Sequence, residues 1–314
     1  MNVLVTGGAG FIGSHCVEDL LTRGFRVRVL DNLSTGKIEN IQGLMDRIEF
    51  IEADLENAAA ARSAVEGMDY VVHLAAIPSV QFSIREPVKS HQSMLTATLS
   101  LFKAAVDYGG IRRIVQAVSA AAYGSSAELP KREDMKPDPL SPYAVAKLAQ
   151  EYYGKVFYSI YDLQVISLRF FNVYGPRQDP ASPYSGVISI FLDRMLDGKP
   201  PVVFGDGSQT RDFIHVSDVT AAVRQACLAI WPGRSEVINI GTGRQTSLNQ
   251  LADTLNKILG TGLKPVFTPD RPGDVHHSLA DITKAQKLLD FRPAVDLEEG
   301  LRSLVRFRLS SGTE

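Results

Sequence analysis

Three glycines at three-residue spacing separate the first apolar run of the chain from its first helical pattern. Residues 3–5 are apolar and mostly β-branched, Gly7, Gly10 and Gly13 follow, and residues 14–21 have helical periodicity. Glycine at these positions permits a sharp turn, lets the backbone approach a pyrophosphate and allows a helix to pack closely on a strand. Amide groups at the helix N-terminus then face the phosphates. This order predicts a phosphate-binding loop, with an ordinary strand-to-helix turn as the alternative.

Strand and helix patterns alternate as far as about residue 170. Strand patterns cover residues 25–30, 48–52, 70–74, 111–118 and 164–170, and helical patterns cover residues 90–107 and 143–161. A crossover between parallel strands needs about a dozen residues or more, so connections of this length predict a parallel sheet with helices on both faces. We therefore expect an α/β fold with a Rossmann-type, doubly wound parallel sheet.

The rhythm changes after about residue 175. Residues 175–183 are rich in turn formers, and short strand patterns at 202–204 and 237–240 are then mixed with helical patterns at 187–197, 247–259 and 281–289. We expect a smaller C-terminal α/β lobe that binds the substrate. The predicted division assigns residues 1–175 and about 215–240 to the Rossmann domain, and about 176–214 and 241–314 to the smaller one.

Two acidic residues follow predicted strands. Asp31 ends the second strand, where a carboxylate accepts hydrogen bonds from an adenosine ribose, although a solvated turn residue is the alternative. The same carboxylate would repel a 2′-phosphate, so NAD is favoured over NADP. Asp54 follows the strand at 48–52 and is a candidate contact to the adenine edge, or else a turn-capping residue.

Composition excludes several classes of protein. With 33 Lys+Arg against 35 Asp+Glu and a formal charge of −2, the chain lacks the basic excess of a nucleic-acid binder, so we expect no such partner. Its two cysteines, Cys16 and Cys227, form no disulfide framework and fit a reducing cytosol. Without a signal-peptide pattern or a long apolar segment, a cytoplasmic protein with no membrane partner is expected. The adjacent His276 and His277 lack metal-ligand spacing, so no metal is expected.

A predicted helix start places two reactive side chains on one face. Ser141 is a preferred N-cap residue and Pro142 suits the first helical position, so Tyr143 and Lys147, four residues apart, share a helix face. An ammonium near a phenol favours the phenolate and lowers the tyrosine pKa, which makes Tyr143 a candidate general base. Ser119 follows the strand at 111–118, at the sheet edge where ligands of this architecture bind. Taken alone, a Tyr/Lys pair is more often a surface stripe and such a serine a turn residue.

Together these motifs resemble the extended short-chain dehydrogenase/reductases, specifically the UDP-hexose 4-epimerases, from residue 1 to about 294. The resemblance rests on the glycine loop, residues 31–36 (DNLSTG), 73–76 (HLAA), Ser119 before Tyr123-Gly124, Tyr143-x-x-x-Lys147, 169–175 (RFFNVYG) and 211–216 (RDFIHV). It implies a tightly bound NAD, with Tyr143 as the base, Ser119 as its partner and Lys147 holding the nicotinamide ribose. In such a cycle the sugar 4-OH is deprotonated, hydride moves from C4 to the nicotinamide, the 4-keto sugar turns over, and hydride returns to its other face.

The resemblance implies two sets of contact residues. Those expected at NAD are Gly7, Gly10, Phe11, Ile12, Gly13, Asp31, Asn32, Ser34, Gly36, Asp54, Leu55, Leu74, Ala75, Ala76, Tyr143, Lys147 and Phe170. Those expected at a UDP-sugar are Ser79, Ser119, Tyr143, Asn172, Gly186, Val187, Val202, Phe204, Gln209, Arg211, Arg271, Asp274 and Ser278. In the second set Arg211 and Arg271 suit the diphosphate, because guanidinium groups match phosphate oxygens with paired hydrogen bonds. Asp274 is expected at the uridine ribose, Phe204 near the uracil, and Asn172 at the diphosphate or the sugar.

Small residues bear on the reaction and the substrate. A related dehydratase or decarboxylase would need carboxylates shortly after Ser119, where this chain has Ala120 and Ala121, and alanine can do no acid–base work. The resemblance places Ser278 and Gly186 at the pocket for the sugar 2-substituent, where their small size suggests room for a 2-N-acetyl group. We therefore expect 4-epimerisation of UDP-GlcNAc/UDP-GalNAc, with UDP-Glc/UDP-Gal as further substrates.

Alternatives remain at this stage. They are another NAD-dependent nucleotide-sugar enzyme on the same fold, such as a UDP-glucuronate epimerase, decarboxylase or dehydratase, and a non-catalytic nucleotide-binding relative. The chain departs from the family pattern at Ala121, where a hydroxyl is common, and at Met94, where an asparagine is expected near the cofactor. The resemblance also implies a homodimer through a four-helix bundle built from residues 90–107 and 143–161.

Overall fold

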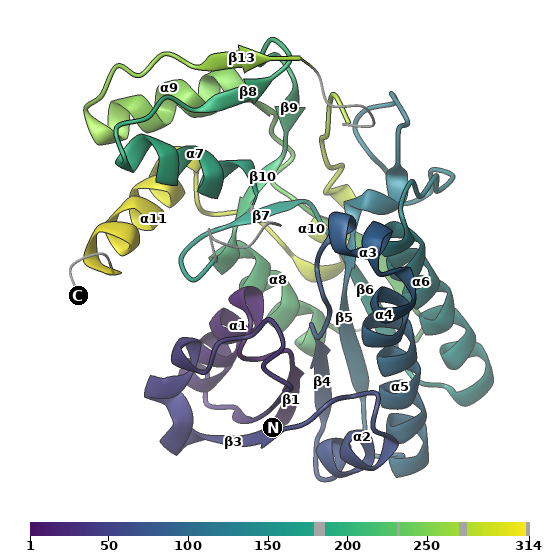
Figure 1. Cartoon of the computed structure of the whole chain (residues 1–314). Coiled ribbons are helices and arrows are strands. Elements are labelled where there is room, and N and C mark those ends of the chain that lie inside the picture. Colours follow the sequence, from purple (N-terminus) through teal and green to yellow (C-terminus); the bar gives the residue numbers. More distant parts are fainter. Residues whose placement is uncertain (179–185, 231–232, 270–274, 312–314) are drawn as a thin grey trace.

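Seven parallel strands form the central sheet within the part of the chain that the structure describes. The structure is a computed structural model that describes residues 1–178, 186–230, 233–269 and 275–311 (Figure 1). The strand order is β11-β6-β5-β4-β1-β2-β3, and every neighbouring pair is parallel. The strands are β1 (Asn2–Thr6), β2 (Arg26–Asp31), β3 (Ile48–Glu52), β4 (Tyr70–His73), β5 (Arg113–Ser119), β6 (Val165–Phe170) and β11 (Glu236–Ile240).

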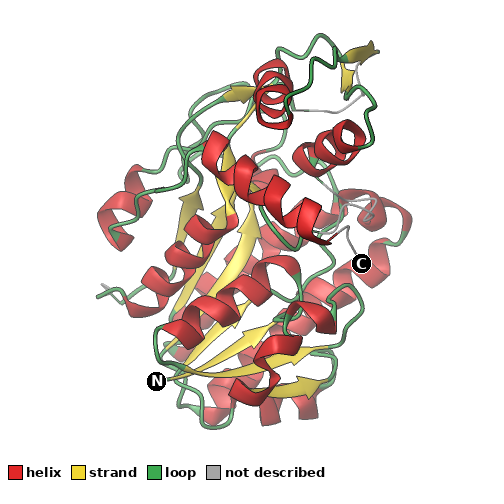
Figure 2. Cartoon of the chain, turned by 90° about the vertical axis from the view of Figure 1, so that its left-hand side faces the viewer, coloured by secondary structure: helices red, strands yellow, loops and turns green. Residues whose placement is uncertain are grey.

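Helices cover both faces of this sheet, as the alternating pattern predicts. Because successive side chains of a strand point to opposite faces, Val3 and Val5 join one apolar core while Leu4 joins the other. The first core is covered by α1 (Phe11–Thr22) and α8 (Val216–Leu228), and the second by α2 (Ala58–Val65), α5 (Ala97–Tyr108) and α6 (Pro142–Tyr161). Figure 2 shows the strands of this sheet with helices packed along them. This is the predicted doubly wound α/β fold.

A smaller lobe lies beyond the carboxyl ends of the strands (Figures 1 and 2). Its elements are α7 (Val187–Leu196), β8 (Val202–Phe204), α9 (Leu248–Leu259), β13 (Val266–Thr268) and α11 (Leu297–Ser311). It has its own apolar core, in which Phe191, Leu251 and Leu304 are buried. Short strand pairs join it to the larger lobe: β7 (Asn172–Tyr174) with β10 (Phe213–His215), and β9 (Thr210–Arg211) with β12 (Thr246–Ser247). The residue limits predicted for two domains stay a prediction.

The predicted helix at 90–107 is interrupted. The chain forms α3 (Val80–Arg85) and α4 (Pro87–His91), then a π-helical stretch at Gln92–Thr96, and only then α5. Within this stretch the Thr98 hydroxyl donates to the Met94 carbonyl at 2.6 Å, and the Gln150 side chain donates to the same oxygen at 3.3 Å. Side chains that bond to helix carbonyls compete with the regular ladder, which explains the local change of pitch. The last helix of the larger lobe, α10 (Thr283–Leu289), begins two residues later than predicted.

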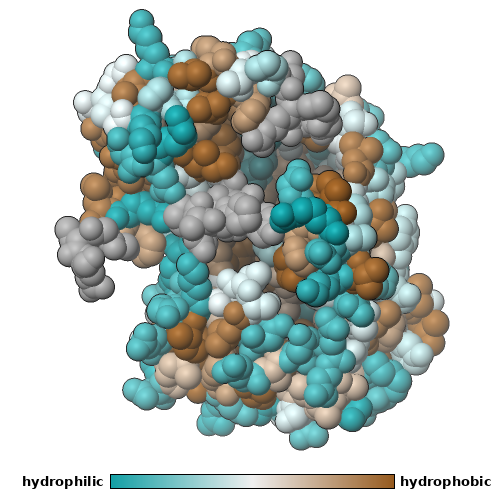
Figure 3. All heavy atoms as spheres, viewed as in Figure 1, coloured by the Kyte–Doolittle hydropathy of each residue, from teal (hydrophilic) through white to brown (hydrophobic). Residues whose placement is uncertain are grey.

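The surface seen in Figure 3 intermixes hydrophilic and apolar residues, in line with the near-neutral composition. None of the helices among the described residues has the length and apolar character needed to cross a membrane. Both cysteines are buried as free thiols.

Candidate active site

The predicted site residues gather at one edge of the sheet. Gly7 follows β1, Asp31 ends β2, Ala75 follows β4, Ser119 ends β5 and Phe170 ends β6. All of these strands are parallel, so their carboxyl ends meet at the same edge, which faces the smaller lobe (Figure 1).

The glycine loop between β1 and α1 needs glycine at specific positions. Gly7 has a φ of +70°, and a Cβ atom there would lie 2.7 Å from the backbone nitrogen of Ala75. A Cβ atom on Gly13 would lie 2.0 Å from the carbonyl oxygen of Gly7, so the helix packs directly on the turn. Gly10 is the N-cap of α1. The bare backbone and the helix N-terminus together fit the pyrophosphate of a dinucleotide.

Asp31 presents a fixed carboxylate beside this loop. It is 6% exposed and accepts hydrogen bonds from the backbone N–H groups of Ala9 and Leu33, each at 2.9 Å. Burial raises its pKa, and the two hydrogen bonds oppose that rise. A Cβ atom on Gly36 would lie 2.9 Å from both carboxylate oxygens, so the loop after β2 closes tightly over them.

Asp54, the second acidic residue, lies in the turn that follows β3 and accepts hydrogen bonds there. Asp54 accepts a hydrogen bond from the Asn32 side chain at 2.8 Å and another from the Glu56 backbone at 2.8 Å. The turn-capping alternative for Asp54 is therefore present in the fold, and its contact with adenine stays a prediction.

Ser119, Tyr143 and Lys147 come together at the sheet edge. Ser141 caps α6 through a bond from the Ala144 N–H at 3.2 Å, as the sequence predicts, and this fixes where the helix begins. The hydroxyl of Ser119 lies close to the phenol of Tyr143 and acts to lower the pKa of that phenol. The Lys147 ammonium donates to the Ala117 carbonyl at 2.8 Å, which anchors α6 to β5.

Burial dominates the ionisation of the tyrosine and the lysine. It raises the pKa of Tyr143, and the Ser119 hydrogen bond acts in the opposite direction. It lowers the pKa of Lys147 to about 8. The lowering of the Tyr143 pKa by Lys147 stays a prediction.

Residues predicted to hold the second ligand line the smaller lobe. Asn172 begins β7, Gly186 caps α7 ahead of Val187, Val202 and Phe204 lie on β8, and the Gln209 side chain donates to the Phe204 carbonyl. Arg211 on β9 donates to the carbonyl oxygens of Thr210 at 2.9 Å and His276 at 3.2 Å. The Ser278 N–H donates to the Thr210 carbonyl at 3.1 Å, so Arg211 and Ser278 are neighbours. Ser79 caps α3. Arg271 and Asp274 lie outside the described residues.

Comparison with known proteins decides the family. Residues 3–241 match the NAD dependent epimerase/dehydratase family. The chain belongs to this family. It is similar to a UDP-glucose 4-epimerase from Thermotoga maritima solved with UDP-glucose, at 42% identity and a TM-score of 0.93, covering 99% of both chains.

Two further solved structures extend the comparison. A UDP-N-acetylglucosamine 4-epimerase from Methanobrevibacter ruminantium, in complex with UDP-N-acetylmuramic acid, shares 38% identity, with a TM-score of 0.94 and coverage of 99% and 98%. A UDP-glucuronic acid 4-epimerase from Bacillus cereus, with UDP-glucuronic acid and NAD, shares 33% identity, with a TM-score of 0.91 and coverage of 99% and 100%. The protein is an NAD-dependent enzyme of the UDP-sugar epimerase family.

In this epimerase-family enzyme, Asp212, the residue after Arg211, joins distant segments of the chain, which the sequence did not predict. Its buried carboxylate accepts from the Thr242 N–H at 2.8 Å, the Thr242 hydroxyl at 2.6 Å, the Gly243 N–H at 3.0 Å and the Ala280 N–H at 3.1 Å. The one available signal was an acidic residue between Arg211 and an apolar strand.

A buried polar chain lies behind the dinucleotide loop. The Ala75 N–H donates to the Thr6 hydroxyl at 3.3 Å, which bonds His73 Nδ1 at 2.8 Å, and His73 Nε2 bonds the Thr98 hydroxyl at 2.9 Å. Because Thr98 donates its hydrogen to Met94, it must accept from Nε2–H of His73. Burial lowers the pKa of His73 to about 3, so the imidazole is neutral.

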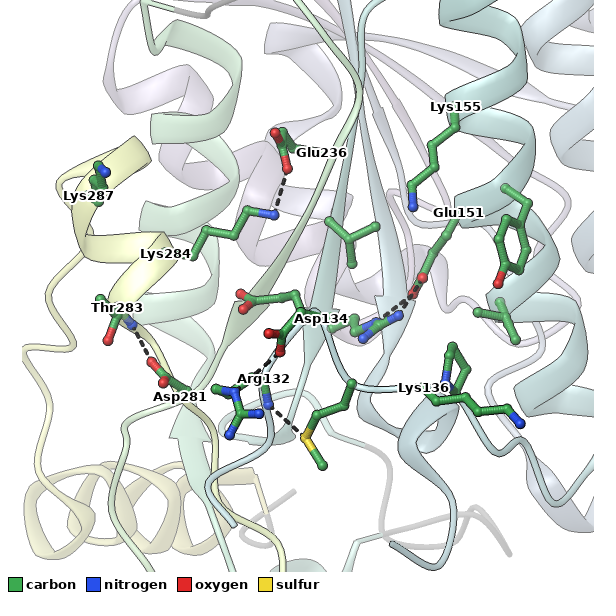
Figure 4. A pocket seen from close by; sticks show the side chains of 17 residues that line it. Arg132, Asp134, Lys136, Glu151, Lys155, Glu236, Asp281, Thr283, Lys284 and Lys287 are labelled. Carbon is green, nitrogen blue, oxygen red and sulfur yellow. Dashed lines mark hydrogen bonds and ion pairs between the residues drawn. The ribbon is translucent and has the colours of Figure 1, made fainter. Parts of the chain in front are cut away.

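An ion pair and a cavity lie beside α6, one helical turn after Lys147. Glu151 and Arg169 pair with both side chains buried, and they belong to the wall of a cavity of about 680 Å³ between α6, β11 and α10 (Figure 4). Among the predicted site residues that the structure describes, none lines this cavity. One sequence clue to the pair is that Glu151 stands four residues after Lys147.

Proposed function

We propose that the enzyme catalyses the 4-epimerisation of UDP-hexoses, accepting UDP-GlcNAc/UDP-GalNAc and also UDP-Glc/UDP-Gal. The observation that carries this proposal is that Ser119 and the phenol of Tyr143 come together at the sheet edge, with Lys147 one helical turn away. This arrangement suits removal of a proton from a sugar hydroxyl. The neighbouring Ala120 and Ala121 offer no second acid or base, which favours a reaction without elimination or decarboxylation.

In the proposed mechanism the glycine loop and Asp31 hold the dinucleotide. When bound there, NAD would supply the hydride acceptor and donor for C4 of the sugar. Tyr143, as phenolate, accepts the proton of the 4-hydroxyl and gives it back after the sugar has turned. Ser119 donates a hydrogen bond to the same oxygen, and Lys147 supplies a positive charge that stabilises the phenolate.

The substrate preference rests on small side chains near the diphosphate position. Ser278 lies beside Arg211 because both bond to the backbone of Thr210. A guanidinium group at Arg211 suits the diphosphate, which would bring the attached sugar toward Ser278. A serine there, with Gly186 at the start of α7, leaves room for a 2-N-acetyl group.

The first experiment is incubation of the purified protein with UDP-GlcNAc and no added cofactor, followed by NMR of the anomeric protons. We expect UDP-GalNAc to appear at unchanged mass, which would support 4-epimerisation, tightly held NAD and the roomy pocket together. UDP-Glc and UDP-glucuronate are tested in parallel. Turnover of UDP-Glc alone would overturn the N-acetyl preference. A change of product mass would indicate a decarboxylase or dehydratase instead.

We also propose a homodimer that pairs α6 with its counterpart in a second copy. Val145, Tyr152, Val156 and Ile160 are exposed on α6 at successive spacings of seven, four and four residues, so they follow one side of the helix. Ile84 on α3 and Val88 on α4, the helices that contact α6, are exposed as well. An apolar stripe of this kind is typical of a helix that packs against a partner.

A further inference from the structure

We propose that Arg169 and Glu151 are positioning residues that hold Tyr143, Lys147 and Ser119 in register for the reaction. The inference rests on the proposed epimerase function. It concerns side chains that lie behind the reactive groups and act through the elements that carry them.

Arg169 and Glu151 are joined by two parallel hydrogen bonds. Arg169 Nε donates to Glu151 Oε1 at 2.8 Å, and Nη2 donates to Oε2 at 2.6 Å. The side chains are 3% and 4% exposed. Two parallel hydrogen bonds between planar groups fix orientation as well as distance. This pair therefore allows little sliding of one element along the other.

The pair ties the reactive helix to the sheet. Glu151 lies one turn after Lys147 and two turns after Tyr143, so the three residues share a face of α6. Arg169 lies on β6 directly before Phe170, which is expected at the cofactor. A shift of the ion pair would therefore move Tyr143 and Lys147 relative to the sheet edge.

The same guanidinium reaches the segment that follows Ser119. It lies over the ring of Tyr123 at 4.6 Å from the centroid, and Tyr123 ends the short helix η4 (Ala120–Tyr123) that begins right after Ser119. The Tyr123 hydroxyl donates to Asn239 Oδ1 at 2.6 Å. Burial raises the pKa of Tyr123 to about 12, so this donor keeps its proton. Arg169 thus contacts the elements that carry all three reactive residues.

The chain of contacts continues from Tyr123 to the segment that precedes α10. Asn239 on β11 donates through Nδ2 to the carbonyl oxygens of Lys131 at 2.8 Å and Asp281 at 3.2 Å. Asp281 closely follows Ser278 in the chain, so the network ends beside the predicted sugar pocket. Figure 4 shows Asp281 and Glu151 around the same cavity.

Stability alone does not account for such a pair. Burying two charges costs about as much as their attraction returns, and replacing a buried pair with apolar residues is often neutral or stabilising. What an apolar pair cannot reproduce is the fixed geometry of two hydrogen bonds and a stacked guanidinium. A positioning role predicts loss of turnover without loss of the fold. A purely stabilising role predicts that turnover and stability are lost together.

The decisive variant is Glu151→Gln, which keeps the shape of the side chain and removes its charge. We expect kcat to fall by about 100-fold, since a displacement near 1 Å in a reactive group costs about that much. The KM for the UDP-sugar and the amount of bound NAD stay at wild-type values. The acidic limb of the kcat–pH profile moves to higher pH, because Tyr143 then lies less favourably against Lys147.

A matched control is Asp19→Asn. Asp19 accepts from Arg224 Nε at 2.8 Å in a partly buried pair that joins α1 to α8 and includes none of the three reactive residues. We expect wild-type kcat and an unchanged pH profile for this variant. A loss of kcat in both variants that follows their loss of thermal stability would overturn the positioning role.

A second variant keeps the proposal testable if Glu151→Gln does not fold. The double substitution Arg169→Met and Glu151→Leu removes both charges while filling the space, so it is expected to fold and still to lose kcat. Any folded variant of the pair with wild-type kcat and pH profile would overturn the proposal. If the wild-type protein turned over no UDP-hexose at all, the proposed function itself would fail instead.

Discussion

Tyr143 concentrates the proposed chemistry in one hydroxyl group. The substitution Tyr143→Phe removes the proton acceptor and leaves Ser119 with its bond from the Ala121 N–H at 3.1 Å. We expect kcat to fall by about 1,000-fold or more, within the range that general acid–base catalysis contributes. Binding of UDP, measured by calorimetry, and the bound NAD stay unchanged. Residual turnover near the wild-type rate would assign the proton transfer to another group.

His73 makes the stability of the fold depend on pH. Its pKa is about 3 in the folded protein against an ordinary value of 6.5. Between these values the unfolded chain binds the extra proton and the folded protein does not, so the free energy of unfolding falls as pH falls. A fully separated pair of pKa values gives a slope of about 1.4 kcal/mol per pH unit in this window.

The variant His73→Gln isolates this contribution. We expect it to be less stable than the wild type at pH 7, because the bonds to Thr6 and Thr98 are weakened, and the difference to shrink steadily between pH 6 and 4. Urea unfolding of the wild type and the variant across this pH range measures the difference in their free energies of unfolding. His15 and the buried carboxyl groups titrate in both proteins and cancel in the difference. Parallel curves would mean that His73 takes up its proton in the folded state.

At the scale of elements, local patterns were readable from the sequence. The glycine loop, the capped start of α6 and the strand ends that carry Asp31 and Ser119 depend on residues close together in the chain, so their spacing predicts them. The match of the Tyr143/Lys147 pair to one helix face has the same origin.

Contacts between elements could not be predicted in this way. Glu151 and Arg169 meet because α6 packs on β6. Asp212 meets Ala280 because two segments that are distant in the chain lie side by side. The π-helical stretch at 92–96 depends on Gln150, which belongs to another helix. Each of these features needs the tertiary fold, which no spacing rule encodes.

The exposed stripe on α6 leads to a prediction about assembly. Val156→Glu places a charge in the middle of the proposed helix interface, where it would be desolvated on association. We expect the protein to shift from dimer to monomer in analytical ultracentrifugation, with the fold retained because Val156 is exposed in the monomer. The control is Ile230→Glu, the same kind of change at an exposed apolar residue away from α6. Wild-type protein that sediments as a monomer would contradict the proposed interface.

For the whole molecule, the proposed function assigns one ligand to each lobe. The glycine loop and Asp31 belong to the sheet, whereas Arg211 and Ser278 belong to the segments that β9 and its neighbours hold together. Asp212 is the residue that joins these segments, because its carboxylate accepts from Thr242, Gly243 and Ala280. Loss of this acceptor should therefore affect one ligand and spare the other.

The variant Asp212→Asn tests that division. The amide group turns an N–H donor toward donors that faced a carboxylate oxygen, and each buried group left unpaired costs about 1–3 kcal/mol. We expect lower thermal stability, at least about tenfold weaker UDP binding by calorimetry, which corresponds to about 1.4 kcal/mol, and unchanged NAD content. The matched control is Asp218→Asn, since the buried Asp218 likewise accepts from two backbone N–H groups, those of Ala294 and Val295. It should lose similar stability and keep UDP affinity. Equal losses of UDP binding in both variants would show that affinity follows overall stability, and Asp212 would then have no particular part in shaping the nucleotide-sugar side.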